Sequence, residues 1–105
     1  MRERDIERHL VRRAKERGGE VRKVQWIGRR GAPDRLVMLP SRYVYTISPF
    51  GEHKSWESAK TVWVELKAPG MKPEPHQLRE HTRMRRMGQR VEVVDSLEGV
   101  EELLR

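Results

Sequence analysis

The chain has 105 residues, with 23 lysines and arginines against 16 aspartates and glutamates, which gives a formal net charge of +7. This length suits one domain with a modest core, and the lack of cysteine excludes disulfides, cysteine-based zinc sites and thiol catalysis. The charged N-terminal segment is not a signal peptide, and no apolar run is long enough to span a membrane. A small, arginine-rich domain of this kind is expected to work in the cytosol on a polyanion, most often nucleic acid.

The first part of the chain predicts one helix and two strands. A helix is expected over residues 2–17, where apolar side chains recur at helical spacing (Ile6, Leu10, Val11 and Ala14). Residues 20–27 (EVRKVQWI) predict a strand, residues 28–34 (GRRGAPD) a tight loop, and residues 35–39 (RLVML) a short apolar strand.

Residues 41–60 form an insert that is unusual in so small a domain. A strand is predicted at 43–47 and a mobile loop at 48–60, where proline, glycine and polar residues are mixed. The insert also carries aromatic side chains (Tyr43, Tyr45, Phe50 and Trp56). Either a hairpin that joins two protomers or a flap over DNA would explain it.

The last part of the chain predicts a strand at 61–67, a helix at 74–87, a strand at 89–95 and a terminal helix capped by Ser96. The resulting order, α-β-β-(insert)-β-α-β-α, indicates an α/β fold with a mixed central sheet flanked by helices. We expect residues 1–105 to form one domain.

The strand TVWVELK, residues 61–67, ends in charged residues. Side chains alternate between the two faces of a strand, so Val62, Val64 and Leu66 form a core face. Glu65 and Lys67 then share the opposite face. Taken alone, they also fit an ion pair on a solvent face, which contributes little to stability.

The loop Gly31-Ala32-Pro33-Asp34 changes this interpretation. If the strand at 35–39 pairs with the strand at 61–67, Asp34 and Glu65 converge. Two carboxylates about 4 Å apart repel by roughly 4 kcal/mol at an effective dielectric constant near 20, so they need a cation between them. Carboxylates, a backbone carbonyl and waters are hard oxygen ligands, which favour Mg²⁺ or Mn²⁺.

Four motifs in this order resemble the VRR-NUC group of the PD-(D/E)XK nuclease superfamily. They are Glu7 in the first helix, the segment GAPD at 31–34, the segment ELK at 65–67, and Gln77 in the later helix. The resemblance implies a restriction-endonuclease-like fold and a metal-dependent phosphodiesterase. Asp34, Glu65 and the main-chain carbonyl of Leu66 would hold Mg²⁺, with Mn²⁺ substituting. The ion would polarise the scissile phosphate and lower the pKa of a bound water.

The resemblance also implies roles for three further catalytic residues. Lys67 would orient the nucleophile and stabilise charge on the phosphorane. Glu7 would be a carboxylate near the metal, and Gln77 would position Lys67 or the phosphate. Each of the last two also fits a simpler interpretation, Glu7 as a boundary residue that reaches water and Gln77 as an ordinary first-turn residue. His76 and His81 are expected to be structural or surface residues.

Arginines give the chain several candidate contacts with nucleic acid. They are Arg79, Arg83 and Arg86 on the second helix, Arg4 and Arg8 on the first, and Arg29 and Arg30 in the loop before Gly31. Contacts of this kind would be made to phosphates and would depend strongly on salt. Solvated helix faces are the alternative for the two helical stripes.

The resemblance implies a specific function, which is resolution of branched DNA such as four-way (Holliday) junctions by a homodimer in a phage or bacterial cytoplasm. A less selective nickase or flap nuclease is an alternative within the enzyme class. A non-catalytic nucleic-acid-binding module and an RNase or toxin are alternatives from other classes.

Overall fold

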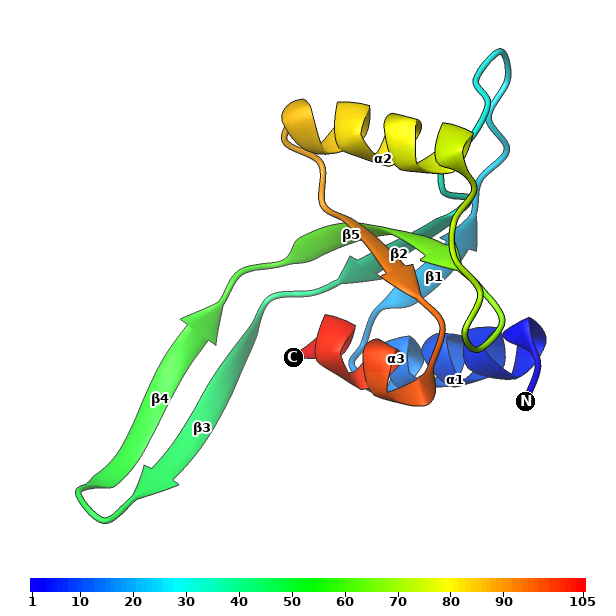
Figure 1. Cartoon of the computed structure of the whole chain (residues 1–105). Coiled ribbons are helices and arrows are strands. Elements are labelled where there is room, and N and C mark those ends of the chain that lie inside the picture. Colours follow the sequence, from blue (N-terminus) through cyan, green and yellow to red (C-terminus); the bar gives the residue numbers. More distant parts are fainter.

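The computed structural model describes residues 1–105 and contains three helices, a four-stranded sheet and a separate two-stranded hairpin (Figure 1). The elements in chain order are α1 (Glu3–Glu16), β1 (Glu20–Lys23), β2 (Arg35–Leu39), β3 (Arg42–Ser48), β4 (Gly51–Glu57), β5 (Lys60–Leu66), α2 (Pro75–Arg86), β6 (Val91–Val94) and α3 (Leu97–Leu104). The predicted α/β fold with a mixed sheet is confirmed.

The sheet has the strand order β1-β2-β5-β6. β1 pairs with β2 and β2 with β5 in antiparallel fashion, whereas β6 runs parallel to β5. A parallel neighbour requires a crossover connection, and α2 supplies it. The pairing of β2 with β5, on which the convergence of Asp34 and Glu65 depends, is therefore present.

The apolar core lies between the sheet and the pair α1 and α3, on one face only (Figure 1). Its members are Ile6, Leu10 and Ala14 from α1, Val37 and Leu39 from β2, Val62, Val64 and Leu66 from β5, Val94 from β6, and Val100, Leu103 and Leu104 from α3. The alternation predicted for residues 61–67 is confirmed. Because burial of these side chains stabilises the domain, the opposite face is free to carry polar groups.

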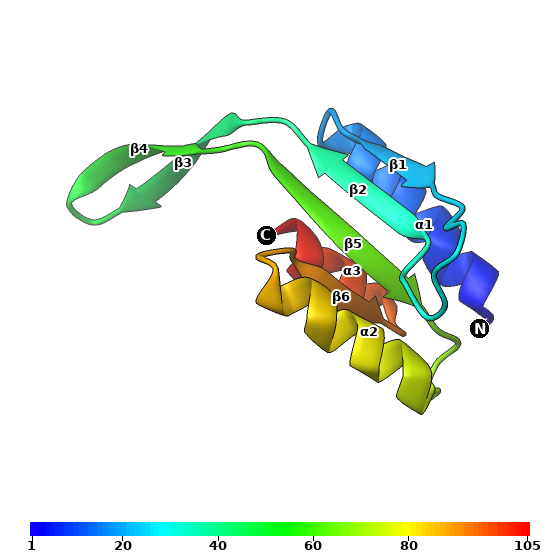
Figure 2. The ribbon, with the colours of Figure 1, turned by 90° about the horizontal axis from the view of Figure 1, so that it is seen from above.

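The opposite face of the sheet is covered by α2 alone. The helix runs along the β6 side and leaves β1 and β2 uncovered on this face (Figure 2). Its buried positions are Glu80, His81 and Met84, so the layer beneath it is more polar than the core below. None of the helices is both long and apolar enough to cross a membrane.

The insert corrects one prediction. Residues 48–60 were expected to form a mobile loop, but Gly51–Glu57 is a strand that pairs with Arg42–Ser48 along its whole length. A tight turn joins the two strands, where the Ser48 hydroxyl accepts a hydrogen bond from the backbone N–H of Phe50 at 3.2 Å. The insert is thus a long hairpin that projects away from the sheet (Figures 1 and 2).

The first strand is also shorter than expected. The prediction covered residues 20–27, but β1 ends at Lys23. One further backbone hydrogen bond, from the N–H of Val24 to the carbonyl of Asp34 at 2.8 Å, continues the pairing before the chain leaves the sheet. After this departure, Gln25 and Trp26 lie beside the end of the sheet where Asp34 lies.

Candidate active site

Asp34 and Glu65 occupy facing positions on neighbouring strands. Arg35 is paired with Val64 in the antiparallel register, so the next position places Asp34 across from Glu65. Directly opposed residues of an antiparallel pair project to the same face of the sheet. The two carboxylates therefore project from the same face of the sheet, which is the face that α2 covers in part.

Burial makes the charge on Glu65 costly. Only 8 % of the residue is exposed, and this burial raises its pKa to about 7, with the negative charge of Asp34 adding to the shift. Lys67 acts in the opposite direction and favours the carboxylate. A cation bound next to the Glu65 carboxylate would favour its charged form and so remove the cost of ionising it.

His81 is a site residue that the sequence prediction missed, although the expectation that it is structural is consistent with its burial. The ring is fully buried on α2, and its Nε2 lies 3.2 Å from Oε1 of Glu65. Burial lowers the pKa of His81, and the nearby charges of Arg85 and Lys67 lower it further, so the ring is neutral. A neutral ring with its proton on Nε2 donates to Glu65 and fixes the orientation of that carboxylate.

Arg35 is the second residue that the sequence prediction missed. It is buried, with only 8 % exposure, and its guanidinium bridges Asp34 at 2.8 Å and Glu7 at 2.9 Å. A signal for it exists in the sequence, because Arg35 alternates with Val37 and Leu39 and must therefore face inward. Glu7 thus reaches the site through Arg35, and its predicted part in metal binding stays a prediction.

The N-terminus of α2 packs closely against the loop that carries Asp34. Gly31 has φ of +87°, and a Cβ atom there would lie 2.8 Å from the carbonyl oxygen of His76. Only glycine accommodates this backbone conformation and this approach together. Gln77 accepts a hydrogen bond from the Glu74 backbone N–H at 2.8 Å, so its side chain completes the helix cap. Its predicted role near Lys67 or the phosphate stays a prediction.

The predicted DNA-contacting arginines are all exposed. Arg79, Arg83 and Arg86 line one hollow of about 380 Å³ on α2, together with Leu78 and Thr82. Arg29 and Arg83 both bind buried Glu80, at 3.1 and 2.9 Å, which ties the loop to the helix. Arg30 follows Arg29 in the same loop. The other two, Arg4 and Arg8, lie on α1, across the sheet from α2 (Figure 1).

The residues present fit a hard divalent cation. Asp34 and Glu65 offer carboxylate oxygens, and the carbonyl of Leu66 follows directly on β5. Burial raises the pKa of Glu65 to about 7, and a cation beside the carboxylate would offset this cost of ionisation. No group of three or more His, Cys, Asp or Glu side chains that could hold a metal ion is gathered anywhere in the chain. The set is therefore two carboxylates, with the remaining ligands left to the backbone, water and substrate.

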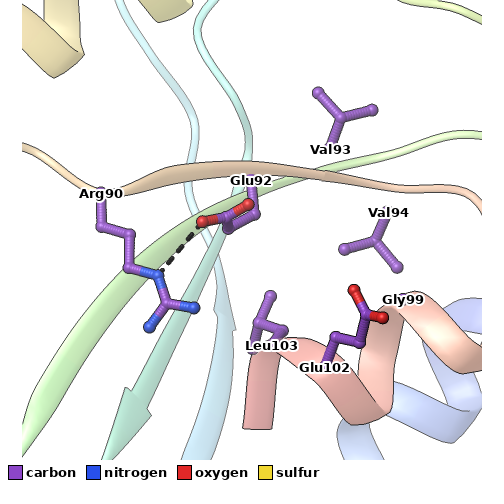
Figure 3. Close-up of a pocket in the computed structure, with 7 residues that line it drawn as sticks. All are labelled: Arg90, Glu92, Val93, Val94, Gly99, Glu102 and Leu103. Carbon is purple, nitrogen blue, oxygen red and sulfur yellow. Dashed lines mark hydrogen bonds and ion pairs between the residues drawn. The ribbon is translucent and has the colours of Figure 1, made fainter. Parts of the chain in front are cut away.

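A different hollow, of about 270 Å³, lies between β6 and α3. Figure 3 shows that its lining includes the carboxylates of Glu92 and Glu102, with Arg90 bound to Glu92 at 3.2 Å. The remaining lining residues are apolar or glycine. Two acids beside one neutralised arginine do not favour a phosphate, so this hollow is not part of the candidate active site.

Replacing His81 with phenylalanine is expected to weaken Mg²⁺ binding by about 10-fold, because groups that orient a metal ligand typically contribute 10- to 100-fold to affinity. His81→Gln keeps an N–H near the position of Nε2 and is expected to recover most of the affinity. Calorimetric titration of each protein with Mg²⁺ measures the effect. Equal affinity in the phenylalanine variant and the wild type would show that His81 does not position Glu65.

Two comparisons with known proteins agree with this geometry. The chain is 44 % identical over 96 residues, which is 91 % of its own length and 85 % of the relative, to "Putative nuclease p44" of Acyrthosiphon pisum secondary endosymbiont phage 1. It is also similar to a solved structure described as "VRR_NUC domain", with 38 % identity, a TM-score of 0.70, and coverage of 97 % of this chain and 92 % of that one. No protein-family model matches the sequence. With these two similarities and two facing carboxylates followed by a lysine, the chain belongs to the VRR_NUC family of nucleases.

Proposed function

We propose that the chain is a Mg²⁺-dependent endonuclease that hydrolyses DNA phosphodiester bonds, with Mn²⁺ able to substitute. The observation that carries this proposal is the register of β2 and β5, which sets Asp34 across from Glu65 with Lys67 two residues beyond. Asp34, Glu65 and the carbonyl of Leu66 would hold the ion. When bound, the ion would supply positive charge to the phosphate and activate water for attack.

The protein's own residues would complete the reaction. Lys67 shares the face of Glu65 and would orient the attacking water and stabilise charge that develops on the phosphate. Arg35 would hold Asp34 in place while also binding Glu7. Gln77, in the first turn of α2, would position Lys67 or the phosphate.

The DNA would lie on the face that α2 leaves partly open. Arg79, Arg83 and Arg86 on α2 and Arg29 and Arg30 in the loop would contact phosphates on either side of the carboxylates. Contacts to phosphates position a duplex without reading its sequence. We therefore expect low sequence specificity and strong dependence on salt.

A homodimer is proposed because the hairpin presents an exposed apolar face. Tyr43, Tyr45 and Ile47 share one face of β3, and Trp56 and Lys54 stand opposite the two tyrosines on β4. Tyr43 and Trp56 stack with ring centroids 4.7 Å apart, yet both stay more than half exposed. Ile47 is 80 % exposed and Phe50 at the tip 94 % exposed.

The size and charge of the hairpin both favour a second copy as its partner. Taking about 150–250 Å² for each large side chain, the exposed apolar groups amount to roughly 700 Å², close to the 800 Å² that each partner contributes to a standard interface. The hairpin carries Arg42 and Lys54 against Glu52 and Glu57, so it is neutral within a chain of charge +7. Self-association through it would avoid the repulsion that the rest of the surface imposes.

Ile47→Lys is expected to convert the dimer to a monomer, because two lysines would then meet across a two-fold interface. Thr46→Lys is the matched control, since Thr46 is also exposed but lies on the other face of the hairpin. Light scattering after size exclusion should give twice 12.5 kDa for the wild type and the control, and 12.5 kDa for Ile47→Lys. A wild-type mass of a single chain would rule out the dimer.

The substrate is proposed to be branched DNA such as a four-way junction. Two sites related by a two-fold axis would allow paired, symmetric nicks. Incubation of the wild type with Mg²⁺ and synthetic junctions, flaps, plain duplex and RNA tests this. Paired nicks at the junction are expected, equal cleavage of duplex would favour an unselective nickase, and cleavage of RNA alone would favour an RNase. The phage relative supports action in the cytoplasm, where such DNA is found.

A further inference from the structure

A groove beside Asp34 has no part in the chemistry described so far. It measures about 670 Å³ and lies where the chain leaves β1 and passes into the loop before β2. Its lining consists of Lys23, Val24, Gln25, Trp26, Arg29, Ala32 and Asp34. This volume is within the range of small-molecule sites, about 300–1,000 Å³. Asp34 forms part of its wall, so the groove is continuous with the candidate active site.

Trp26 forms a fixed aromatic wall of this groove. Its indole N–H donates a hydrogen bond to the carbonyl of Pro33 at 2.9 Å, and its ring packs against Trp63 with centroids 5.1 Å apart and planes tilted by 48°. The residue nonetheless keeps 36 % of its surface exposed. A ring held from two sides and open on the remainder offers a stacking surface without loss of side-chain freedom on binding.

The polar residues of the groove favour an anionic ligand. Lys23 and Arg29 are exposed. Arg29 and Arg83 share the single carboxylate of Glu80, at 3.1 and 2.9 Å, so one positive charge remains uncompensated and the Arg29 guanidinium is held at the groove. Asp34 is the one acid in the lining, and Arg35 already binds it. An aromatic wall with two cations and the amide of Gln25 matches one nucleotide, whose base stacks, whose phosphate binds cations and whose polar edges accept or donate hydrogen bonds.

We propose that this groove receives an unstacked nucleotide next to the scissile phosphate, with its base on Trp26 and its backbone near Lys23 and Arg29. The proposal rests on the proposed nuclease function, and it gives a structural reason why the nuclease would prefer branched DNA. Drawing a base out of an intact duplex costs unpairing and unstacking free energy, and this cost is least where the strand is already distorted. Branch points and flaps would therefore bind better than plain duplex, without any reading of sequence.

The test couples a change in the protein to a change in the DNA. Binding is measured by fluorescence anisotropy with Mg²⁺ in the Lys67→Ala background, so that the DNA stays intact, and wild-type cleavage maps the scissile position separately. The DNA is a four-way junction, either intact or with one abasic site moved along the strand through the mapped position. Trp26→Leu is expected to weaken binding of the intact junction about 10-fold, within the range known for stacking of one base on an aromatic side chain.

An abasic site at one position beside the scissile phosphate should weaken binding by the same factor. On that abasic junction, Trp26→Leu should weaken binding further by less than about 2-fold, because the two changes remove the same contact between base and indole. Independent effects that multiply would overturn the proposal, as would the absence of any sensitive abasic position. The search for a sensitive abasic position uses protein in which Trp26 is unchanged, so its result does not depend on whether the Trp26 variants fold. Trp26→Phe, which keeps a stacking ring, should bind within about 3-fold of the parent. Failure of wild-type cleavage would refute the nuclease function, whereas failed coupling refutes only the groove.

Discussion

Replacing Lys67 with alanine is expected to lower the cleavage rate by about 100- to 1,000-fold, the usual cost of removing one group that stabilises charge in the transition state. DNA binding should change by only a few-fold, because many arginines remain to contact phosphates. The expected loss of cleavage follows from the strand geometry. Lys67 shares the face of Glu65 and is close enough to act on its charge. Single-turnover cleavage and equilibrium binding, measured on the same junction, separate the two effects.

Lys72→Ala is the matched control for this experiment. Lys72 is an exposed lysine in the loop that follows Lys67, so its loss removes the same charge from the same region. Both cleavage and binding should stay close to wild type in this variant. Cleavage by a pure Lys67→Ala preparation at the wild-type rate would mean that the catalytic assignment of Lys67 is wrong.

The second large effect is expected at Glu65, where catalysis and stability should change in opposite directions. Glu65→Gln is expected to abolish cleavage, because the variant lacks one of the two carboxylates that would hold the ion. In chelator at pH 8, the same variant should be more stable than wild type by about 3 kcal/mol, because it no longer ionises a buried group. Thermal unfolding should show a rise on the order of 10 °C for a domain of this size.

The dependence on pH follows from the raised pKa of Glu65. Its ordinary pKa is 4.5 and its pKa in the folded, metal-free protein is about 7. The folded state therefore holds this proton more tightly than the unfolded chain does. The stability that this proton provides is fully present below pH 4.5 and is lost as pH rises through 7. The advantage of Glu65→Gln should thus appear between these values and be absent in more acidic solution.

Glu92→Gln provides the control for Glu65→Gln. Glu92 lies on the neighbouring strand β6 and binds Arg90 at the surface. Its replacement should therefore change stability by less than about 0.5 kcal/mol, both at pH 8 and in more acidic solution. Excess Mg²⁺ should stabilise the wild type and leave Glu65→Gln unaffected, because binding to the folded state alone raises stability. An advantage of Glu65→Gln that did not vary with pH would show that burial of its charge is not the cause.

The sequence predicts those parts of the site that depend on strand pairing. Alternation along residues 61–67 assigns Val62, Val64 and Leu66 to the core, and the order of elements indicates which strands lie together. Once β2 pairs with β5, the position of Asp34 relative to Glu65 follows from the register. The same local patterns predict α1, α2 and α3, because each carries either an apolar stripe or a recognisable cap.

The partners of the site residues depend on tertiary packing, which local patterns do not reveal. His81 approaches Glu65 only because α2 packs along the β6 side of the sheet, and nothing in its neighbours in sequence indicates this contact. Glu80 joins Arg29 to α2 across 51 positions of sequence for the same reason. Arg35 is different, since its inward position on an apolar strand already requires a carboxylate partner.

Strand β4 escaped prediction because its residues, GEHKSWE, show no alternation of apolar and polar side chains. The strand has no buried face to require such a pattern. Its conformation comes from pairing with β3 across a tight turn, and both faces of the hairpin are largely exposed. Patterns of burial predict only strands that bury a face.

The hairpin leaves the sheet at the end of β2 and returns at the start of β5, whereas Asp34 and Glu65 lie at the opposite ends of those strands. Lengthening, shortening or exchanging it would leave the carboxylates in register, because the pairing of β2 with β5 holds them. The proposed dimer contact and the candidate active site therefore lie in separable pieces of one short chain. The hairpin could therefore be replaced by another binding element, which would change the partner protein without altering the candidate active site.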